Sequence, residues 1–294
     1  MENFVYENYR QDLYYTGTDL VGIIRFGSIC LWIQRFVYPV IPHQNMGISS
    51  SELAGNSGIS ADVIDFCGCF EKLAENSDEG QERRNKSWSA MDNNGNRHVS
   101  LAEADSWIKQ TLIKQYPEKG ERLWKAFRRS YIRSFKDAAD AGRDRAVQGM
   151  VNATEDDFVE RGEFRLFCAY LCLYALMYDA FKFLDGSYTR EVPETVFSSL
   201  EATAESNKDN KISHEEWMSG YARFAGSPFF ILNECASNPE AAASAWAMMD
   251  ADGKGAVLLV EFCEWIKAWE IQTNSLMGRF LDAGARDASG DRVE

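Results

Sequence analysis

Oxygen-bearing side chains recur between Asp92 and Glu103 at a spacing that could surround a hard cation. Ca²⁺ is bound by about six to eight oxygens, and a 12-residue loop supplies them from positions 1, 3, 5, 7, 9 and 12. In the window DNNGNRHVSLAE these positions are filled by Asp92, Asn94, Asn96, His98 (through its backbone carbonyl), Ser100 and Glu103. Arg97 takes position 6, where a left-handed backbone favours glycine, and only two of the ligands are acids. We therefore expect a calcium site of weak or moderate affinity.

The window from Asp250 to Glu261, DADGKGAVLLVE, has the same frame with a poorer ligand set. Its candidate ligands are Asp250, Asp252 and Glu261. Lys254 at position 5 and Leu258 at position 9 remove two oxygens, and the ammonium would repel the ion. Two interpretations remain open, a calcium site and a loop that keeps only its structural role.

A third window runs from residue 205 to residue 216, with the sequence ESNKDNKISHEE. Its candidate ligands are Glu205, Asn207, Asp209, Lys211 (through its carbonyl) and Glu216. Asp185 opens another loop of this kind, but Val196 replaces its closing glutamate, so we expect that loop to bind nothing. We favour the Glu205 window as the true third loop because Glu216 can close a coordination shell. The sequence leaves the choice between the two loops open.

These loops need helices on both sides to hold them. Apolar residues spaced three and four apart predict helices from residue 86 to about residue 272. We predict an all-α fold, with no sheet beyond two-residue pairings between loops. Such pairings should be made by the apolar residues at position 8, Val99, Ile212 and Val257. The apolar run 163–184 has a short uncharged centre, which favours a buried helix over a membrane span.

The pattern divides the chain into four parts. They are an N-terminal extension (1–80), a first lobe of paired helix–loop–helix units with one good and one degenerate loop (84–175), a second such lobe (176–272) and a polar tail (273–294). Ser60 should cap a short helix over 61–73. The polar stretch 75–86 is expected to be a linker at the domain boundary.

Two segments look suited to docking. Residues 20–41 are largely apolar and predict a helix that packs on protein; Arg25 would be costly inside a bilayer, although membrane contact remains open. Residues 122–136 combine six basic side chains with an aromatic stripe formed by Trp124, Phe127, Tyr131 and Phe135. We interpret this basic stretch either as the first helix of a degenerate unit with a solvated face or as a docking surface for an acidic partner.

The composition narrows the classes of function. The chain has 31 basic and 45 acidic residues, a formal net charge of −14, which disfavours nucleic-acid binding and suits cation binding. Its seven cysteines form no C-x-x-C pair, and its three histidines are far apart, which disfavours zinc sites. The sequence contains no P-loop, nucleophile elbow or paired-histidine motif, so we expect no enzymatic activity.

Several runs resemble a known family. The run NKSWSAMDNNGNRHVSLAEADSW (85–107) resembles the first EF-hand of calflagin-like proteins, the flagellar calcium-binding proteins of protists. The run DDFVERGEFRLFCAYL (156–171) resembles the degenerate second hand of that family, and DADGKGAVLLVEF (250–262) resembles its last hand. The resemblance covers roughly residues 85 to 270. It implies an all-helical, two-lobed protein of the EF-hand superfamily that binds Ca²⁺ and changes conformation with it.

The same resemblance implies residence in a cilium or flagellum, on the cytoplasmic side. One expected function is a calcium-binding protein that is calcium-responsive or stabilising within a larger assembly. The alternative is a structural subunit of an axonemal or membrane-associated complex that keeps the EF-hand fold with little or no calcium binding. Acidic tubulin tails are a candidate partner for the basic stretch 122–136.

Overall fold

The computed structural model describes residues 59–75, 77–147, 158–186, 209–275 and 277–278. These residues are mostly helical, which confirms the predicted all-α class. Their helices are α3 (Ala61–Ala74), α4 (Asp78–Met91), α5 (Leu101–Gln115), α6 (Gly120–Ala126), α7 (Arg128–Val147), α8 (Phe164–Leu184), α9 (His214–Gly220), α10 (Phe230–Ser237), α11 (Pro239–Met249) and α12 (Leu259–Gln272), with the 3-10 turns η2 (Arg161–Glu163) and η3 (Tyr221–Phe224). The predicted docking helix 20–41 lies outside the described residues.

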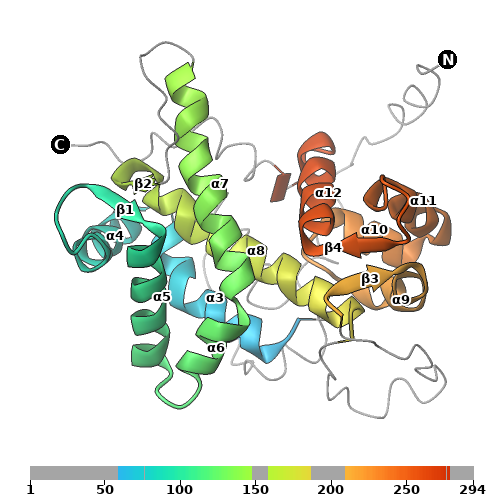
Figure 1. Ribbon diagram of the computed structural model, residues 1–294, viewed down its shortest axis with the longest axis horizontal. Coiled ribbons are helices and arrows are strands. Elements are labelled where there is room, and N and C mark those ends of the chain that lie inside the picture. The colour runs from blue at the N-terminus through green and yellow to red at the C-terminus, as the bar shows by residue number, and fades with distance from the viewer. Residues whose placement is uncertain (1–58, 76, 148–157, 187–208, 276, 279–294) are drawn as a thin grey trace, which may run out of the picture.

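Helix α8 runs through the middle of the molecule (Figure 1). Nineteen of its 21 residues are buried, because apolar side chains occupy every face of the helix. The stretch Arg161–Leu184 is long and apolar enough to cross a membrane, yet 94% of its most apolar window is buried inside the protein. The prediction of a buried core helix over this run is confirmed.

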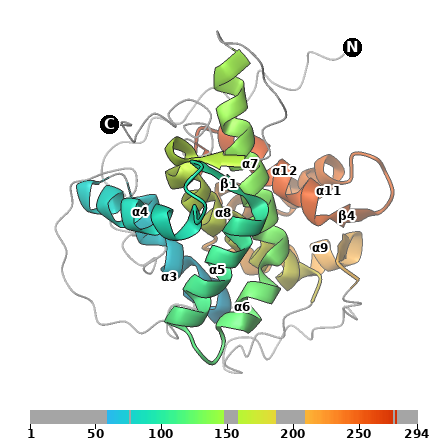
Figure 2. The same cartoon turned by 60° about the vertical axis from the view of Figure 1, so that its left-hand side comes forward.

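On one side of α8 lie α3 to α7, which we call the N-terminal group. Helix α3 packs along α8, and its start agrees with the sequence prediction because Ser60 caps it by accepting the Val63 N–H at 3.3 Å. The Ser60 N–H in turn donates to Asp179 Oδ2 of α8 at 3.0 Å. Figures 1 and 2 both show α7 crossing α8 on this side.

The predicted linker over 75–86 is wrong. Residues from Asp78 onward form α4, which begins at an N-cap where Ser77 accepts the Gly80 N–H at 3.0 Å. The stretch is polar, but Arg84 is 98% buried and donates to the carbonyl oxygens of Leu73 and Glu75 at 2.8 and 2.6 Å. A tertiary contact therefore stabilises a helix that composition alone does not show, and α3 belongs to the folded body.

On the other side of α8 lie α9 to α12, which we call the C-terminal group. Four short strands link the loops in two antiparallel pairs, β1 (His98–Ser100) with β2 (Phe158–Glu160) and β3 (Lys211–Ser213) with β4 (Ala256–Leu258). The pairings span three residues rather than two. Their central pairs are Val99 with Val159 and Ile212 with Val257, all four fully buried.

The expected division at 175/176 falls inside α8, so the two groups share their central helix. The boundary fails because residues 166–184 are apolar on all faces, and a helix of this kind needs neighbours all round it. Helix α12 packs against α8 from the C-terminal group, as α3 and α7 do from the N-terminal group. The second expected lobe also contains a further helix, α10, between α9 and α11.

The basic stretch 122–136 is divided between two helices that meet at Phe127. Three residues of its aromatic stripe, Phe127, Tyr131 and Phe135, are buried, and Trp124 is partly buried. Four of its six basic side chains form ion pairs with carboxylates of the same chain. These pairs are Arg122 with Asp62, Lys125 with Glu121, Arg128 with Asp105, and Arg133 with Asp137 and Glu264. The free basic surface is therefore smaller than the sequence suggests.

Candidate metal-binding loops

The predicted ligands of the Asp92 loop lie together between α4 and α5. Asp92 caps the end of α4, and Glu103 lies in the first turn of α5, where it accepts the Ser100 N–H at 2.9 Å. The turn between them is held by side chains that accept nearby backbone N–H groups. The bonds are Asn96 N–H to Asn94 Oδ1 (2.9 Å), His98 N–H to Asn96 Oδ1 (2.8 Å) and Arg97 N–H to Asp92 Oδ2 (3.1 Å).

The Asp92 carboxylate has one oxygen without a partner. Its side chain is only 9% exposed, Oδ2 accepts the Arg97 N–H, and Oδ1 is buried with no hydrogen bond. On the far side of the loop, Asn94 Nδ2 donates to Glu103 Oε1 at 2.7 Å. A buried carboxylate oxygen that lacks a donor is costly, and a cation at this point would remove that cost.

The loop from Asp250 to Glu261 repeats this frame between α11 and α12. Asp250 caps α11 and accepts the Gly255 N–H at 3.0 Å, while Glu261 accepts the Leu258 N–H at 2.7 Å. The Lys254 ammonium forms an ion pair with Asp252, which lowers the pKa of the Asp252 carboxyl and raises that of Lys254. The ammonium thus engages a candidate ligand of this loop.

In the third window, Glu216 lies in the first turn of α9. It is 5% exposed; its Oε2 accepts the Ser213 N–H at 2.8 Å, and its Oε1 is buried without a hydrogen bond. Asp209 accepts the Lys211 N–H at 3.0 Å. Glu205 and Asn207 lie outside the described residues.

Asp185, which we expected to open a separate loop, contacts the loop that ends at Glu216. Each of the three loops has an aspartate at the end of a helix that accepts the N–H of a residue with positive φ. The pairs are Asp92 with Arg97 at 3.1 Å, Asp250 with Gly255 at 3.0 Å and Asp185 with Asn210 at 3.0 Å. Asp185 therefore accepts the N–H of the positive-φ residue in the loop that ends at Glu216, as Asp92 and Asp250 do in their own loops.

A sequence signal for Asp185 exists. It directly follows an apolar residue that ends a helix, as Asp92 follows Met91 and Asp250 follows Met249. Spacing along the sequence does not predict the contact, because it joins residues 25 positions apart, whereas Asp92 and Arg97 are five apart.

A fourth unit pairs with the Asp92 loop. Val159 lies opposite Val99, and Glu163 stands four residues later, the same offset that separates Val99 from Glu103. Glu163 is 97% buried and accepts the Glu160 N–H at 2.8 Å. His98 lies opposite Glu160 and is exposed, which agrees with a role for its backbone carbonyl and not for its ring.

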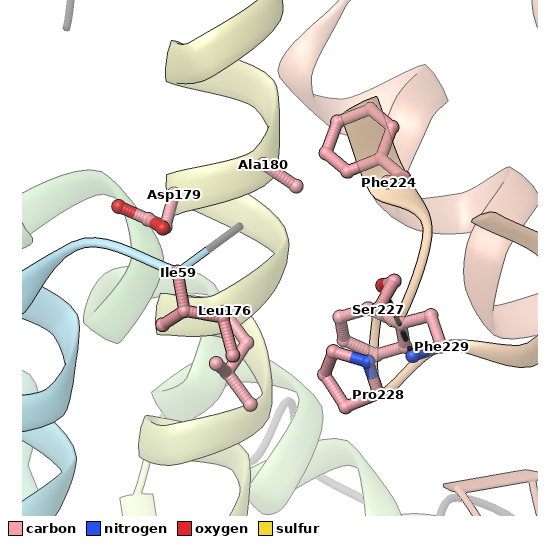
Figure 3. Close-up of a pocket in the computed structure, with 8 residues that line it drawn as sticks. All are labelled: Ile59, Leu176, Asp179, Ala180, Phe224, Ser227, Pro228 and Phe229. Carbon is pink, nitrogen blue, oxygen red and sulfur yellow. Dashed lines mark hydrogen bonds between the residues drawn. The ribbon is translucent and has the colours of Figure 1, made fainter. Parts of the chain in front are cut away.

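Two hollows lie away from the Asp92 loop. The gap drawn in Figure 3, between α8 and the segment from Phe224 to Phe229, has a volume of about 20 Å³, enough for one water. Figure 3 shows the Asp179 carboxylate turned away from that segment. A groove of about 340 Å³ lies between α7, α8 and the start of α12, with Arg129, Tyr174 and Val260 in its lining.

Among the described residues, no three His, Cys, Asp or Glu side chains gather around one point. The Asp92 loop has only two acids, so its remaining donors are amide, hydroxyl and carbonyl oxygens. No family model matches the chain, and no curated protein matches it significantly. The interpretation of the loops therefore depends on their residues and geometry alone.

Proposed function

We propose that this chain is a calcium-binding protein of the EF-hand type, with the Asp92 loop as its principal ion site. The observation that carries the proposal is the buried Oδ1 of Asp92, which has no hydrogen-bond donor while Oδ2 is held by the Arg97 N–H. The paired strands support it, because Val99 and Val159 couple two helix–loop–helix units back to back.

The residues of this loop fit Ca²⁺. The side chains of Asp92, Asn94, Asn96 and Glu103 and the His98 carbonyl are hard oxygen donors at the spacing that the ion requires. Bound calcium would supply positive charge to the two carboxylates. Because Asn94 donates to Glu103 at 2.7 Å, ligation would exchange this hydrogen bond and move both side chains.

We further propose that the protein acts within a larger assembly, on the cytoplasmic side of a cilium or flagellum. Leu258 and Val260 are 46% and 55% exposed beside the groove at Arg129. Arg129 has no carboxylate partner among the described residues. The exposed apolar side chains and the Arg129 guanidinium suit a partner segment with apolar and acidic side chains.

Deleting residues 1–45 should release the protein from the particulate fraction of cell extracts, and unchanged sedimentation would contradict this part of the proposal.

A structural subunit with little calcium binding is the second candidate. It is favoured by the ammonium groups that engage two loop acids, Lys254 with Asp252 and Lys182 with Asp185. In that case the loops would serve only to join helices, and the fold would be independent of calcium.

Calorimetric titration of the full chain with Ca²⁺ separates the two candidates. We expect binding with a dissociation constant between about 0.1 and 10 µM if the protein is a sensor. Glu103→Gln should abolish the tightest binding, and Glu261→Gln is the matched control at the same position of the Asp250 loop. No heat at millimolar Ca²⁺ would leave the structural candidate. A larger loss from Glu261→Gln would show that the ranking of the loops is wrong.

A further inference from the structure

The start of α12 differs from the starts of α5 and α9, the other two helices that follow a candidate metal-binding loop. Helices α5 and α9 begin after Ser100 and Ser213, whose hydroxyl oxygens accept the N–H of the third residue of the helix. Helix α12 begins after Leu258, which makes no such side-chain hydrogen bond. Serine is among the best residues at a helix N-cap, and leucine is among the worst. The chain therefore carries a locally unfavourable residue at this point.

Burial within the chain does not compensate for the missing cap, because Leu258 is 46% exposed. Val260, in the first turn of α12, is 55% exposed, whereas the equivalent residues of α5 and α9 are Ala102 and Glu215. Two exposed apolar side chains thus stand where the other units have serine, alanine or glutamate. Contiguous exposed apolar side chains with polar residues around them are typical of interaction sites.

Both side chains lie at the groove of about 340 Å³ between α7, α8 and the start of α12. Leu259, Ile132 and Tyr178 line the same groove, so aliphatic and aromatic groups from all three helices contribute to its wall. This volume is within the range of small-molecule pockets. A small molecule inside the groove would, however, leave the exposed sides of Leu258 and Val260 in water. A protein segment that crosses the rim would cover them.

Positive charge lies beside the same rim. The Arg129 guanidinium lines the groove and donates to Asn210 Oδ1 at 3.1 Å, with no carboxylate partner among the described residues. Lys211 is exposed and lies directly opposite Leu258 in the β3–β4 pair, where opposite side chains share one face. Asp209, whose Oδ1 accepts the Lys211 N–H, offsets only part of this charge. On a chain with a net charge of −14, such a local excess of positive charge favours an acidic partner.

We propose that this groove binds an amphipathic segment of a partner protein, with Leu258 and Val260 as its apolar contacts and Arg129 as the partner of a carboxylate on that segment. The proposal rests on the part of the proposed function that places the protein in a larger assembly, and it names the surface that docks. The residue that removes a ligand oxygen from the Asp250 loop is then the residue that contacts the partner. Docking therefore does not require calcium.

The test uses the full-length protein in EDTA, with a displayed library of random peptides as the probe. Selected peptides should be rich in leucine, isoleucine or phenylalanine together with aspartate or glutamate. Leu258→Ser should weaken their binding by at least about 10-fold, because a large apolar contact is lost. The same substitution should raise the melting temperature by roughly 2–4 °C, because serine can cap α12. Weaker binding by a more stable protein cannot result from misfolding.

Arg129→Gln should weaken peptide binding by about 3- to 10-fold at low salt and by less at high salt. Two matched controls lie away from the groove, Ile113→Ser at an exposed aliphatic residue of α5 and Lys72→Gln at an exposed lysine of α3. Neither control should change binding by more than about 2-fold.

The proposal is overturned if no peptide is enriched, if basic peptides are enriched, or if the selected peptides bind Leu258→Ser as tightly as wild type. Dodecanoate that binds wild type but not Val260→Glu would make a small apolar acid the occupant and replace the proposal. A wild-type dimer in sedimentation velocity that Val260→Glu dissociates would make a second copy the occupant, with the same consequence. Deletion of residues 1–45 tests membership of a larger assembly separately, since its sedimentation result does not depend on the peptides.

Discussion

At the scale of single residues, the sixth position of each loop shows how backbone conformation limits sequence. Arg97, Asn210 and Gly255 have φ of 68°, 65° and 74°. A left-handed conformation costs an ordinary residue roughly 1–2 kcal/mol, whereas glycine is nearly free of this cost and asparagine tolerates it. The sequence predicted this conformation at Arg97 from the frame of the loop. The Asp92 loop therefore carries a strain that the Asp250 loop avoids.

We predict that Gly255→Ala lowers the free energy of unfolding by about 1 kcal/mol. An added Cβ at Gly255 meets no atom within 4 Å, so the effect would come from the backbone alone. Arg97→Gly should raise the free energy of unfolding by up to about 1 kcal/mol. Urea denaturation followed by circular dichroism measures both.

Gly68→Ala is the control, because Gly68 lies in α3 and a Cβ there meets only Tyr116 Oη at 3.9 Å. It should stabilise by roughly 0.5–1 kcal/mol, since alanine favours a helix over glycine. If Gly255→Ala stabilises the protein as Gly68→Ala does, the strain argument is wrong.

At the scale of elements, Glu270 near the end of α12 holds the start of α10. Its Oε1 accepts the Ile231 N–H at 3.0 Å, and its Oε2 accepts the Ser275 hydroxyl. The residue is fully buried, and burial raises the pKa of its carboxyl although these hydrogen bonds oppose the shift. The folded state thus binds the proton of this carboxyl more tightly than the unfolded chain does. Its stabilisation is present below pH 4.5 and is lost as the pH rises through the folded-state pKa.

We predict that Glu270→Gln raises the melting temperature at pH 7, because the amide imitates the protonated acid. Its oxygen can still accept the Ile231 N–H, and its nitrogen can donate to the Ser275 hydroxyl. The gain over wild type should shrink towards zero below pH 4.5. Differential scanning calorimetry between pH 4 and 8 measures it, with Glu240→Gln, an exposed acid on α11, as the charge control. A lower melting temperature at pH 7 would contradict the prediction.

The sequence predicted those elements whose signals are local. The cap at Ser60, the apolar core of α8 and the position-8 residues of the strands could all be recognised from spacing. Helix α4 could not, because the burial of Arg84 against α3 carbonyls is a tertiary contact. The contact of Asp185 with Asn210 could not be predicted for the same reason, since it joins residues 25 positions apart.

At the scale of the whole molecule, both groups of helices pack on one central helix. Phe167 of α8 lies 5.9 Å from Phe135 of the N-terminal group, measured between ring centroids, and Phe181 lies 5.8 Å from Phe262 of the C-terminal group. Ion pairs add a direct link, because Lys267 of α12 lies 2.8 Å from Asp137 of α7. Neither group can lose α8 without exposing its own core.

We therefore predict that the described part of the chain unfolds in one cooperative transition. Phe181→Ala should lower the free energy of unfolding by about 3–5 kcal/mol, because a large buried ring leaves a cavity. It should shift the tryptophan fluorescence and circular dichroism curves equally, since tryptophans lie on both sides of α8, for example Trp107 and Trp265. Phe158→Ala, at a ring 40% exposed, should change little. A biphasic curve in which Phe181→Ala moves only one phase would show two independent lobes.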